Sequence, residues 1–431
     1  VVLVSFLLLS FVVAAQSDHS DHDELPPIIF VKQTPVDFTV GTIADVFNNA
    51  VGHSPELAQP VGGGLYRLDP DGTLTNLTPF ENIAVRDPEM SYDGERVIFA
   101  MKRGARGKWQ IHEMNVDGSD LRRVNPSSSS NDWDPAYMPD GRILFVSDRL
   151  EAIARANENI PPEKLPEGLL FSMNPNGTHI ETINIHPHGS FNPQVGQNGL
   201  IYFTQWDLND LRPSPNAPPD GISISRFLIW EVFTNGSREG HPIFGQHVIE
   251  DFAGGFTEAR ELPNGDMIAT LTRSEYSYGA GAIVRFTPHG NDDMHGYTYL
   301  TPSAGYEQTT GHDSGRYRSA YPLADGRIMA SFADGPVWDY GESGYAPDFD
   351  LVLLHDNGEG YEVIHADPDY WDWQPVEVAP RPMPQLAEPQ TIDGYRRYAI
   401  LNSMDVEFRH RNADIVVNGD TQPDIARGEA A

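Results

Sequence analysis

One pattern recurs along this chain: a short strand, an Asp-Gly or Asn-Gly turn, and a second strand rich in Ile, Val and Phe. Asn-Gly and Asp-Gly readily adopt the positive φ angles that a tight β-hairpin needs. The starts of the pattern lie roughly 45–65 residues apart, at Asp87, Asp134, Asn192, Glu258 and Ser319. This spacing is typical of propeller blades that carry loop insertions.

A second turn recurs independently of the first, as in LYRLDPDGTLTNLT and IHEMNVDGSDLRRV. We interpret it as the hairpin that joins the third and fourth strands of each blade. Its glycines are Gly72, Gly118, Gly177, Gly236, Gly290 and Gly358. This hairpin occurs six times and the first one only five times, so one blade lacks its first hairpin.

Two lone strands supply what that blade lacks. PIIFVKQ, at residues 27–33, precedes the hairpin of Gly72, and QPVEVAP, at residues 374–380, follows the last repeat. Gln374-Pro375 stands where three other repeats have Asp-Pro or Asn-Pro. We therefore predict an all-β, six-bladed β-propeller whose last blade combines the N-terminal strands with one C-terminal strand. Such closure leaves no open sheet edge between the first and last blades.

The composition of the two ends predicts the domain organisation. VVLVSFLLLSFVVAAQ resembles a secretory signal with a truncated start, because small residues at Val13-Ala14-Ala15 suit a cleavage site. We predict a signal peptide at 1–15, an acidic, His-containing linker at 16–27, the propeller at 28–382 and a Pro-rich extension at 383–431. The extension either packs on the propeller or begins a further domain. The mature chain is then periplasmic or extracellular, without a membrane span.

Charge and cysteine content exclude several function classes. The net charge of −33 repels nucleic acid and anionic membranes. The chain has no cysteine, which rules out disulfides, a thiolate nucleophile, Cys-ligated zinc and a covalently attached c-type haem. The sequence also lacks the G-x-S-x-G, H-E-x-x-H and P-loop motifs.

Alignment of the repeats places six polar residues at one equivalent position, the start of the innermost strand, which faces the channel of a propeller. They are Asp87, Asp134, Asn192, Glu258, Ser319 and Gln374. The carboxylates of Asp87, Asp134 and Glu258, with three neutral oxygen donors, could hold a hard cation such as Ca²⁺. The alternative is that these side chains cap neighbouring strand ends or bind channel water.

A second group of residues could line one mouth of the channel: His188, Trp206, Asp207, His312 and Arg318. A histidine there could act as a metal ligand or a general base. The alternative is that the histidines are scattered over the surface. His19 and His22, in DHSDHDE, could bind divalent metals loosely or belong to a solvated tail.

The repeats resemble those of a known family. RDPEMSYDGERVIFAMKR, WDPAYMPDGRILFVSDR and the hairpin NVDGSDLRRV are similar to the repeats of TolB-like propellers. Together with IIFVKQTPV and QPVEVAPRPMP, their order resembles hydrazine synthase alpha subunit-like proteins over residues 28–384. That resemblance implies c-type haems attached through C-x-x-C-H, which this cysteine-free chain cannot hold. We therefore expect a shared propeller without the reaction centre.

Three functions agree with these observations. The first is an exported binding or scaffold module for a protein or cell-envelope ligand. The second is a metal-dependent propeller enzyme, of the calcium type, with its site at the central channel. The third is a haem-free accessory subunit related to hydrazine synthase alpha. A propeller fold alone does not choose among them.

Overall fold

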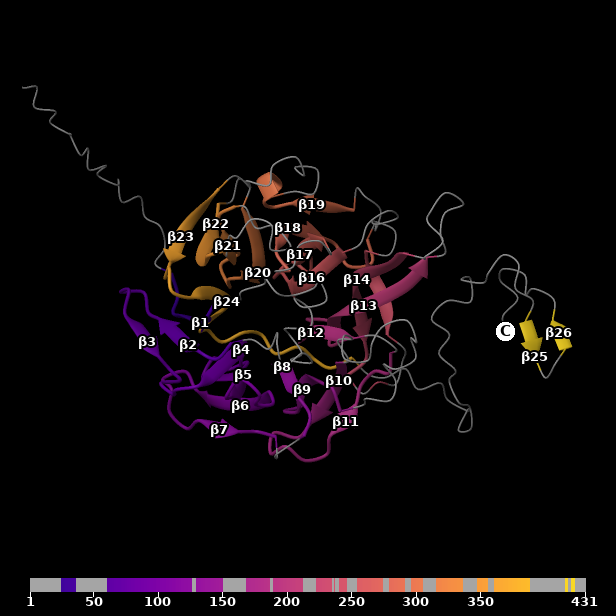
Figure 1. Cartoon of the computed structure of the whole chain (residues 1–431), viewed down its shortest axis with the longest axis horizontal. Coiled ribbons are helices and arrows are strands. Elements are labelled where there is room, and N and C mark those ends of the chain that lie inside the picture. Colours follow the sequence, from indigo (N-terminus) through magenta and orange to yellow (C-terminus); the bar gives the residue numbers. More distant parts are fainter. Residues whose placement is uncertain are drawn as a thin grey trace, which may run out of the picture.

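The computed structural model shows a β-propeller, with its sheets arranged around a central axis (Figure 1). It describes residues 25–35, 60–125, 129–149, 168–186, 189–211, 222–234, 236, 240–245, 254–273, 279–290, 296–304, 315–335, 347–355, 360–387, 415–417 and 420–422. The predicted signal peptide at 1–15 lies outside these residues, as does most of the predicted linker.

Within the described residues, the strands form six antiparallel blades of four, which confirms the predicted fold class. The first two blades follow one another directly in the sequence. The first comprises β4 (Ile83–Met90), β5 (Arg96–Arg103), β6 (Gln110–Asn115) and β7 (Arg122–Arg123). The second comprises β8 (Asp132–Tyr137), β9 (Ile143–Ser147), β10 (Leu169–Met173) and β11 (Glu181–Thr182).

The next three blades are joined by short strand pairs into one continuous sheet. The third comprises β12 (Ser190–Val195), β13 (Ile201–Leu211), β14 (Ile222–Val232) and β15 (His241–Phe244). The fourth comprises β16 (Gly254–Glu261), β17 (Met267–Arg273), β18 (Gly281–Phe286) and β19 (Tyr297–Tyr299), followed by a 3₁₀ turn at Pro302–Ala304. The fifth comprises β20 (Arg316–Pro322), β21 (Ile328–Ala333), β22 (Phe349–Leu354) and β23 (Tyr361–His365).

The sixth blade closes the ring with strands from both ends of the propeller. Its order is β24 (Trp371–Glu377), β1 (Ile28–Gln33), β2 (Gly63–Leu68) and β3 (Leu74–Asn76). β24 and β1 run antiparallel, from Gln33 opposite Trp371 to Ile28 opposite Glu377. The predicted composite blade is therefore confirmed. Two further strands, β25 (Ile415–Val417) and β26 (Asp420–Gln422), pair with each other.

The hairpin turns have the positive φ angles that their Asp-Gly and Asn-Gly sequences predict. Gly94 and Gly141 have φ angles of +74° and +84°, and the N–H of each closes its turn onto the carbonyl three residues earlier. In the second set of hairpins the fifth turn differs: His289 takes the positive φ, +55°, beside Gly290. Gly358 lies outside the described residues.

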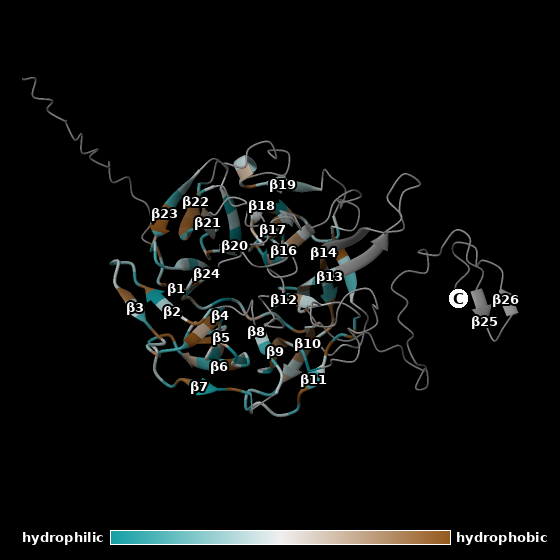
Figure 2. Ribbon diagram, viewed as in Figure 1, coloured by the Kyte–Doolittle hydropathy of each residue, from teal (hydrophilic) through white to brown (hydrophobic). Residues whose placement is uncertain are grey.

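The hydrophobic core lies between neighbouring blades. Trp109 and Trp133, at 1% and 0% exposure, belong to one cluster shared by the first three blades. Figure 2 shows the contrast between the hydrophobic strand β5 and the hydrophilic outer strand β7. Blade-to-blade packing thus fixes the inner strands around the channel. In the part of the chain that the structure describes, no helix is long and apolar enough to cross a bilayer.

Candidate functional site: the central ring and the neighbouring pocket

Each innermost strand carries a β-bulge at the position that the repeat alignment singled out. The strand register shifts there, for example between Arg86 and Glu89 in β4. The residue at each bulge has a left-handed backbone, with φ between 46° and 55°, which side chains other than Asn and Asp seldom adopt. The six residues are Asp87, Asp134, Asn192, Glu258, Ser319 and Gln374. The structure thus brings all six together around one small cavity.

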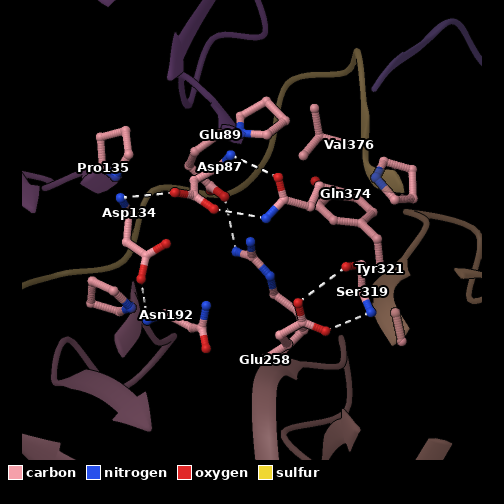
Figure 3. Close-up of a pocket in the computed structure, with 15 residues that line it drawn as sticks. Asp87, Glu89, Asp134, Pro135, Asn192, Glu258, Ser319, Tyr321, Gln374 and Val376 are labelled. Carbon is pink, nitrogen blue, oxygen red and sulfur yellow. Dashed lines mark hydrogen bonds and ion pairs between the residues drawn. The ribbon is translucent and has the colours of Figure 1, made fainter. Parts of the chain in front are cut away.

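Hydrogen bonds join several of these residues to their neighbours in the ring (Figure 3). The Oε1 atom of Gln374 accepts from the N–H of Asp87 at 2.9 Å. Asp87 Oδ2 accepts from the N–H of Asp134 at 3.2 Å, and Asp134 Oδ2 accepts from the N–H of Asn192 at 2.8 Å. The side chains of Gln374, Asp87 and Asp134 therefore each cap the backbone of the next blade, in agreement with the alternative interpretation of the ring.

The other side of the ring repeats this arrangement. Glu258 Oε2 accepts from the N–H of Ser319 at 2.6 Å, and its Oε1 accepts from the Ser319 hydroxyl at 3.1 Å. Arg318 Nη2 also donates to Glu258 Oε1, at 2.8 Å, while its guanidinium lies 4.3 Å from the centre of the Trp373 ring. The carboxylate of Glu258 therefore has both backbone and cationic partners.

A second guanidinium enters the ring beside Asp87. Arg86 Nε donates to Asp87 Oδ2 at 2.5 Å, and Arg86 Nη2 lies 3.6 Å from Asp134 Oδ1. Arg86 and Arg318 thus bring two positive charges to a ring with three carboxyl groups. A Ca²⁺ ion there would have to compete with both guanidinium groups for Asp87 and Glu258.

The carboxyl groups of the ring differ in their acidity. Burial opposes ionisation of Asp87, but Arg86 outweighs it and the pKa of Asp87 is lowered. Glu258 behaves alike, because Arg318 outweighs burial and lowers its pKa. Burial and the adjacent charge of Asp87 instead raise the pKa of Asp134 well above its ordinary value. Asp134 is therefore the ring carboxyl that most readily holds a proton.

The cavity inside the ring is small. It encloses about 50 Å³ and is lined by the ring residues and the prolines that follow them, including Pro88 and Pro135. That volume holds a few water molecules or one ion, but no organic substrate. A second cavity of about 50 Å³ lies on the other side of the ring, where Arg86 and Arg318 contribute to its wall.

A much larger pocket of about 450 Å³ adjoins the ring at the hairpin end of the channel. Hairpin residues such as Tyr92, Gln197 and Leu323 form one side, and the segment that follows β24, residues 379–384, forms another. The sequence did not predict this pocket, because its walls come from several blades and from the C-terminal segment.

An ion-pair cluster fixes the C-terminal segment to the pocket wall. Glu89, 4% exposed, accepts from Arg260 at 2.9 Å and from Arg381 at 2.6 Å. Arg381 also donates to the carbonyl of Met90 at 3.0 Å, and its guanidinium lies 4.5 Å from the centre of the Tyr92 ring. These contacts hold the segment across the channel end, and Figure 1 shows it crossing the middle of the molecule.

Two hairpin glycines permit this close approach. A Cβ atom on Gly94 would lie 2.6 Å from the backbone of Pro380, and one on Gly199 would lie 2.0 Å from the carbonyl of Gln385. The N–H of Ala387 in turn donates to the carbonyl of Gly199 at 3.3 Å. The beginning of the predicted extension thus packs on the propeller.

The residues predicted for a channel mouth do not come together as one described group. Arg318 lines the second small cavity, while Trp206, 6% exposed, belongs to the hydrophobic core and is not among the described residues that line these cavities. His188 and His312 lie outside the described residues, and so does the side chain of Asp207.

Sequence reasoning missed one group of side chains that could hold a metal ion. Glu231, His241 and His289 place their ligand atoms within 4.8 Å of one another. They come from two strands of the third blade and a hairpin of the fourth. No local motif links them, so only the assembled propeller shows them as a group.

The fold and the ring define a six-bladed β-propeller closed by strands from both ends of its sequence. No family model matches the chain. Its sequence is similar to hydrazine synthase subunit alpha of Kuenenia stuttgartiensis, with 26% identity over 322 residues, which cover 68% of this chain and 38% of that protein. The resemblance noted from the repeats is therefore confirmed at the level of sequence similarity.

One solved structure shares the fold at a TM-score above 0.5. Kuenenia stuttgartiensis hydrazine synthase superimposes with a TM-score of 0.61 and 18% identity, covering 84% of this chain and 48% of that one. TolB from Acinetobacter baumannii gives a TM-score of 0.41 and 12% identity over 81% of this chain and 66% of that one. The chain thus spans less than half the length of either hydrazine synthase chain that it matches. Without cysteine it has no C-x-x-C-H haem motif.

Proposed function

We propose that this propeller is an exported binding module that takes a protein ligand into the pocket at the hairpin end of the channel. The observation that supports the proposal is the pocket itself, whose volume of about 450 Å³ lies in the range of ligand sites. The small cavities at the ring could not accept such a ligand. The apolar N-terminal sequence with its small-residue cleavage site supports export.

The walls of the pocket suit an extended peptide segment. Prolines and tyrosines form much of its surface, and these side chains lose little conformational freedom when a ligand binds. They are Tyr92, Tyr321, Pro263, Pro322, Pro380, Pro382 and Pro384. Shape and rigidity thus favour a partner that presents a short apolar stretch.

Two carboxylates add polar specificity. Glu261 accepts from the N–H of Gln197 at 2.7 Å, and Glu377 accepts from the N–H of Ala324 at 2.8 Å. Burial raises the pKa of both glutamates, which marks a partly dry surface. Each carboxylate has a second oxygen that could accept from a ligand N–H group or ammonium.

A peptide-display selection on the full chain tests this proposal. Peptides selected on the wild type should bind the variant Ala324→Trp at least about tenfold more weakly, because the indole would fill the pocket. Pro139→Trp is the matched control, since Pro139 occupies the same hairpin position in the second blade and is not among the described residues of the pocket. Equal binding to both variants would contradict the proposed site.

A calcium-dependent enzyme is the second candidate, favoured by the six oxygen-bearing residues around the ring cavity. The third is a haem-free accessory subunit, favoured by the 26% identity to hydrazine synthase subunit alpha. That third function predicts a stable complex with haem-bearing proteins of the same cell, which size-exclusion chromatography with haem absorbance would detect.

A further inference from the structure

Two histidines and a glutamate meet at the outer edge of the third and fourth blades. Glu231 lies on β14 and His241 directly opposite it on β15. His241 Nε2 lies 3.0 Å from Glu231 Oε1, and His289 Nε2 lies 3.2 Å from Glu231 Oε2. His289 belongs to the hairpin after β18, so the group joins two blades.

A backbone hydrogen bond fixes the hairpin that carries His289 against the third blade. The N–H of His289 donates to the carbonyl of Ile243 at 3.3 Å, which ties the hairpin of the fourth blade to β15. His289 takes the positive φ of its turn, whereas in the hairpins of Gly72 and Gly118 the glycine itself takes it. The imidazoles are therefore positioned by the fold and not only by their contacts with Glu231.

The carboxylate of the cluster is buried, while its two imidazoles remain accessible to an ion from solvent. The side chain of Glu231 is 6% exposed, whereas those of His241 and His289 are 42% and 52% exposed. A buried anionic oxygen thus lies below two imidazole nitrogens that an ion can reach from solvent.

The ligand atoms match a particular class of ion. Zn²⁺ bonds to imidazole nitrogen and carboxylate oxygen at about 2.0–2.2 Å, so the ligand atoms of a tetrahedral centre lie about 3.3 Å apart. His241 Nε2 and His289 Nε2 lie 3.0 and 3.2 Å from different oxygens of Glu231, and the ligand atoms of the three residues all lie within 4.8 Å of one another, so the three groups are close enough to share one ion. Imidazole nitrogen suits Zn²⁺, Cu²⁺ and Ni²⁺, whereas Ca²⁺ prefers oxygen ligands throughout.

We propose that Glu231, His241 and His289 bind a Zn²⁺-type ion that fastens the outer edge of the third blade to the fourth. The ion replaces the two histidine–carboxylate hydrogen bonds with three coordinate bonds. The described residues supply three ligands, and water completes the tetrahedron. This site lies away from the ring and the pocket, and its role is independent of the proposed ligand.

Calorimetric titration of the metal-free full chain with ZnCl₂ at pH 7.5 tests the proposal. The wild type should bind one ion tightly, and His289→Ala and Glu231→Gln should each weaken that binding at least about tenfold, since a ligand is lost. His179→Ala is the matched control, because His179 is an exposed hairpin histidine of the second blade with φ of +52°. It should bind Zn²⁺ as the wild type does.

A second set of measurements separates this site from the histidines near the N-terminus. The double variant His19→Ala, His22→Ala should retain the tight site. Zn²⁺ should raise the melting temperature of the wild type and of this double variant, but not that of His289→Ala. Ca²⁺ should have no such effect through these residues. The proposal is overturned if His289→Ala binds Zn²⁺ as tightly as the wild type, or if the wild type binds none.

Discussion

Gln374 and Asp87 make two hydrogen bonds to each other although 287 positions separate them in the sequence. The N–H of Asp87 donates to Gln374 Oε1 at 2.9 Å, and Gln374 Nε2 donates to Asp87 Oδ1 at 2.7 Å. Since Gln374 lies on the last inner strand and Asp87 on the first inner strand of the next blade, this pair joins the two ends of the propeller.

The variant Gln374→Ala should lower the free energy of unfolding by about 1–3 kcal/mol, because it removes the acceptor of the Asp87 N–H and one of the donors to the Asp87 carboxylate. Urea denaturation followed by tryptophan fluorescence measures the change. Gln374→Gly separates the hydrogen bonds from backbone strain, since glycine accepts the φ of +52° at this position. An alanine variant as stable as the wild type would show that the hydrogen bonds contribute little, and a glycine variant more stable than the alanine variant would show the strain.

Arg381→Ala should loosen the segment that walls the pocket. The change removes an ion pair with Glu89, a hydrogen bond to Met90 and the contact with Tyr92, and should cost about 1–3 kcal/mol because Arg260 still pairs with Glu89. Hydrogen exchange of residues 381–387 should become faster. Arg381→Lys keeps the positive charge but loses the planar guanidinium with its several N–H donors. This variant should therefore recover only part of the protection of these amides against hydrogen exchange.

Asp372 should make stability depend on pH. Its side chain is 0% exposed, and burial raises its pKa to about 8, with Lys32 only partly opposing. Because the unfolded pKa is about 3.9, the folded chain binds this proton more tightly, and stability falls as pH rises from about 4 to 8. The melting curves of wild type and Asp372→Asn should therefore agree near pH 4, with the variant a few degrees higher near pH 8.

Asp367→Asn provides a control of opposite sign. Asp367 accepts from Lys32 Nζ at 2.6 Å, and this hydrogen bond lowers its pKa. Its stabilising contribution is present above pH 4 and is lost as the pH falls through the folded pKa. The variant should therefore melt below the wild type at neutral pH. If Asp372→Asn behaves in the same way, the inferred burial cost of Asp372 is wrong.

The ring offers a direct comparison between the binding module and the calcium enzyme. Since Arg86 and Arg318 already neutralise Asp87 and Glu258, we expect neither chelator nor added CaCl₂ to change the melting temperature. The calcium alternative predicts a rise with Ca²⁺ that Asp134→Asn abolishes. Differential scanning fluorimetry of both proteins measures this, and a rise confined to the wild type would favour the enzyme.

Much of the fold could be predicted because its signals are local. An Asp-Gly or Asn-Gly turn between two apolar runs determines a hairpin without reference to distant residues, and the unequal numbers of the two hairpins indicated the composite blade. The ring positions could also be predicted from the repeats, because residues at the same position of each innermost strand lie at similar distances from the propeller axis.

The chemistry of those positions depended on contacts that no repeat encodes. Arg86 and Arg318 directly precede ring residues, but other blades have Trp133 or Phe191 at the same place. Whether such a side chain turns towards the carboxylates depends on its neighbours across the channel. The large pocket could not be predicted either, because one of its walls is a segment without regular structure that lies across several blades.

The composite blade also has a consequence for biosynthesis. A nascent chain can form its five later blades in order, but β1 has no partner on its inner side until β24 has been made. A product that stops before Trp371 would expose that strand to other molecules, and such unpaired edges favour aggregation. The toroid thus cannot close until synthesis has passed β24, the last strand of the propeller.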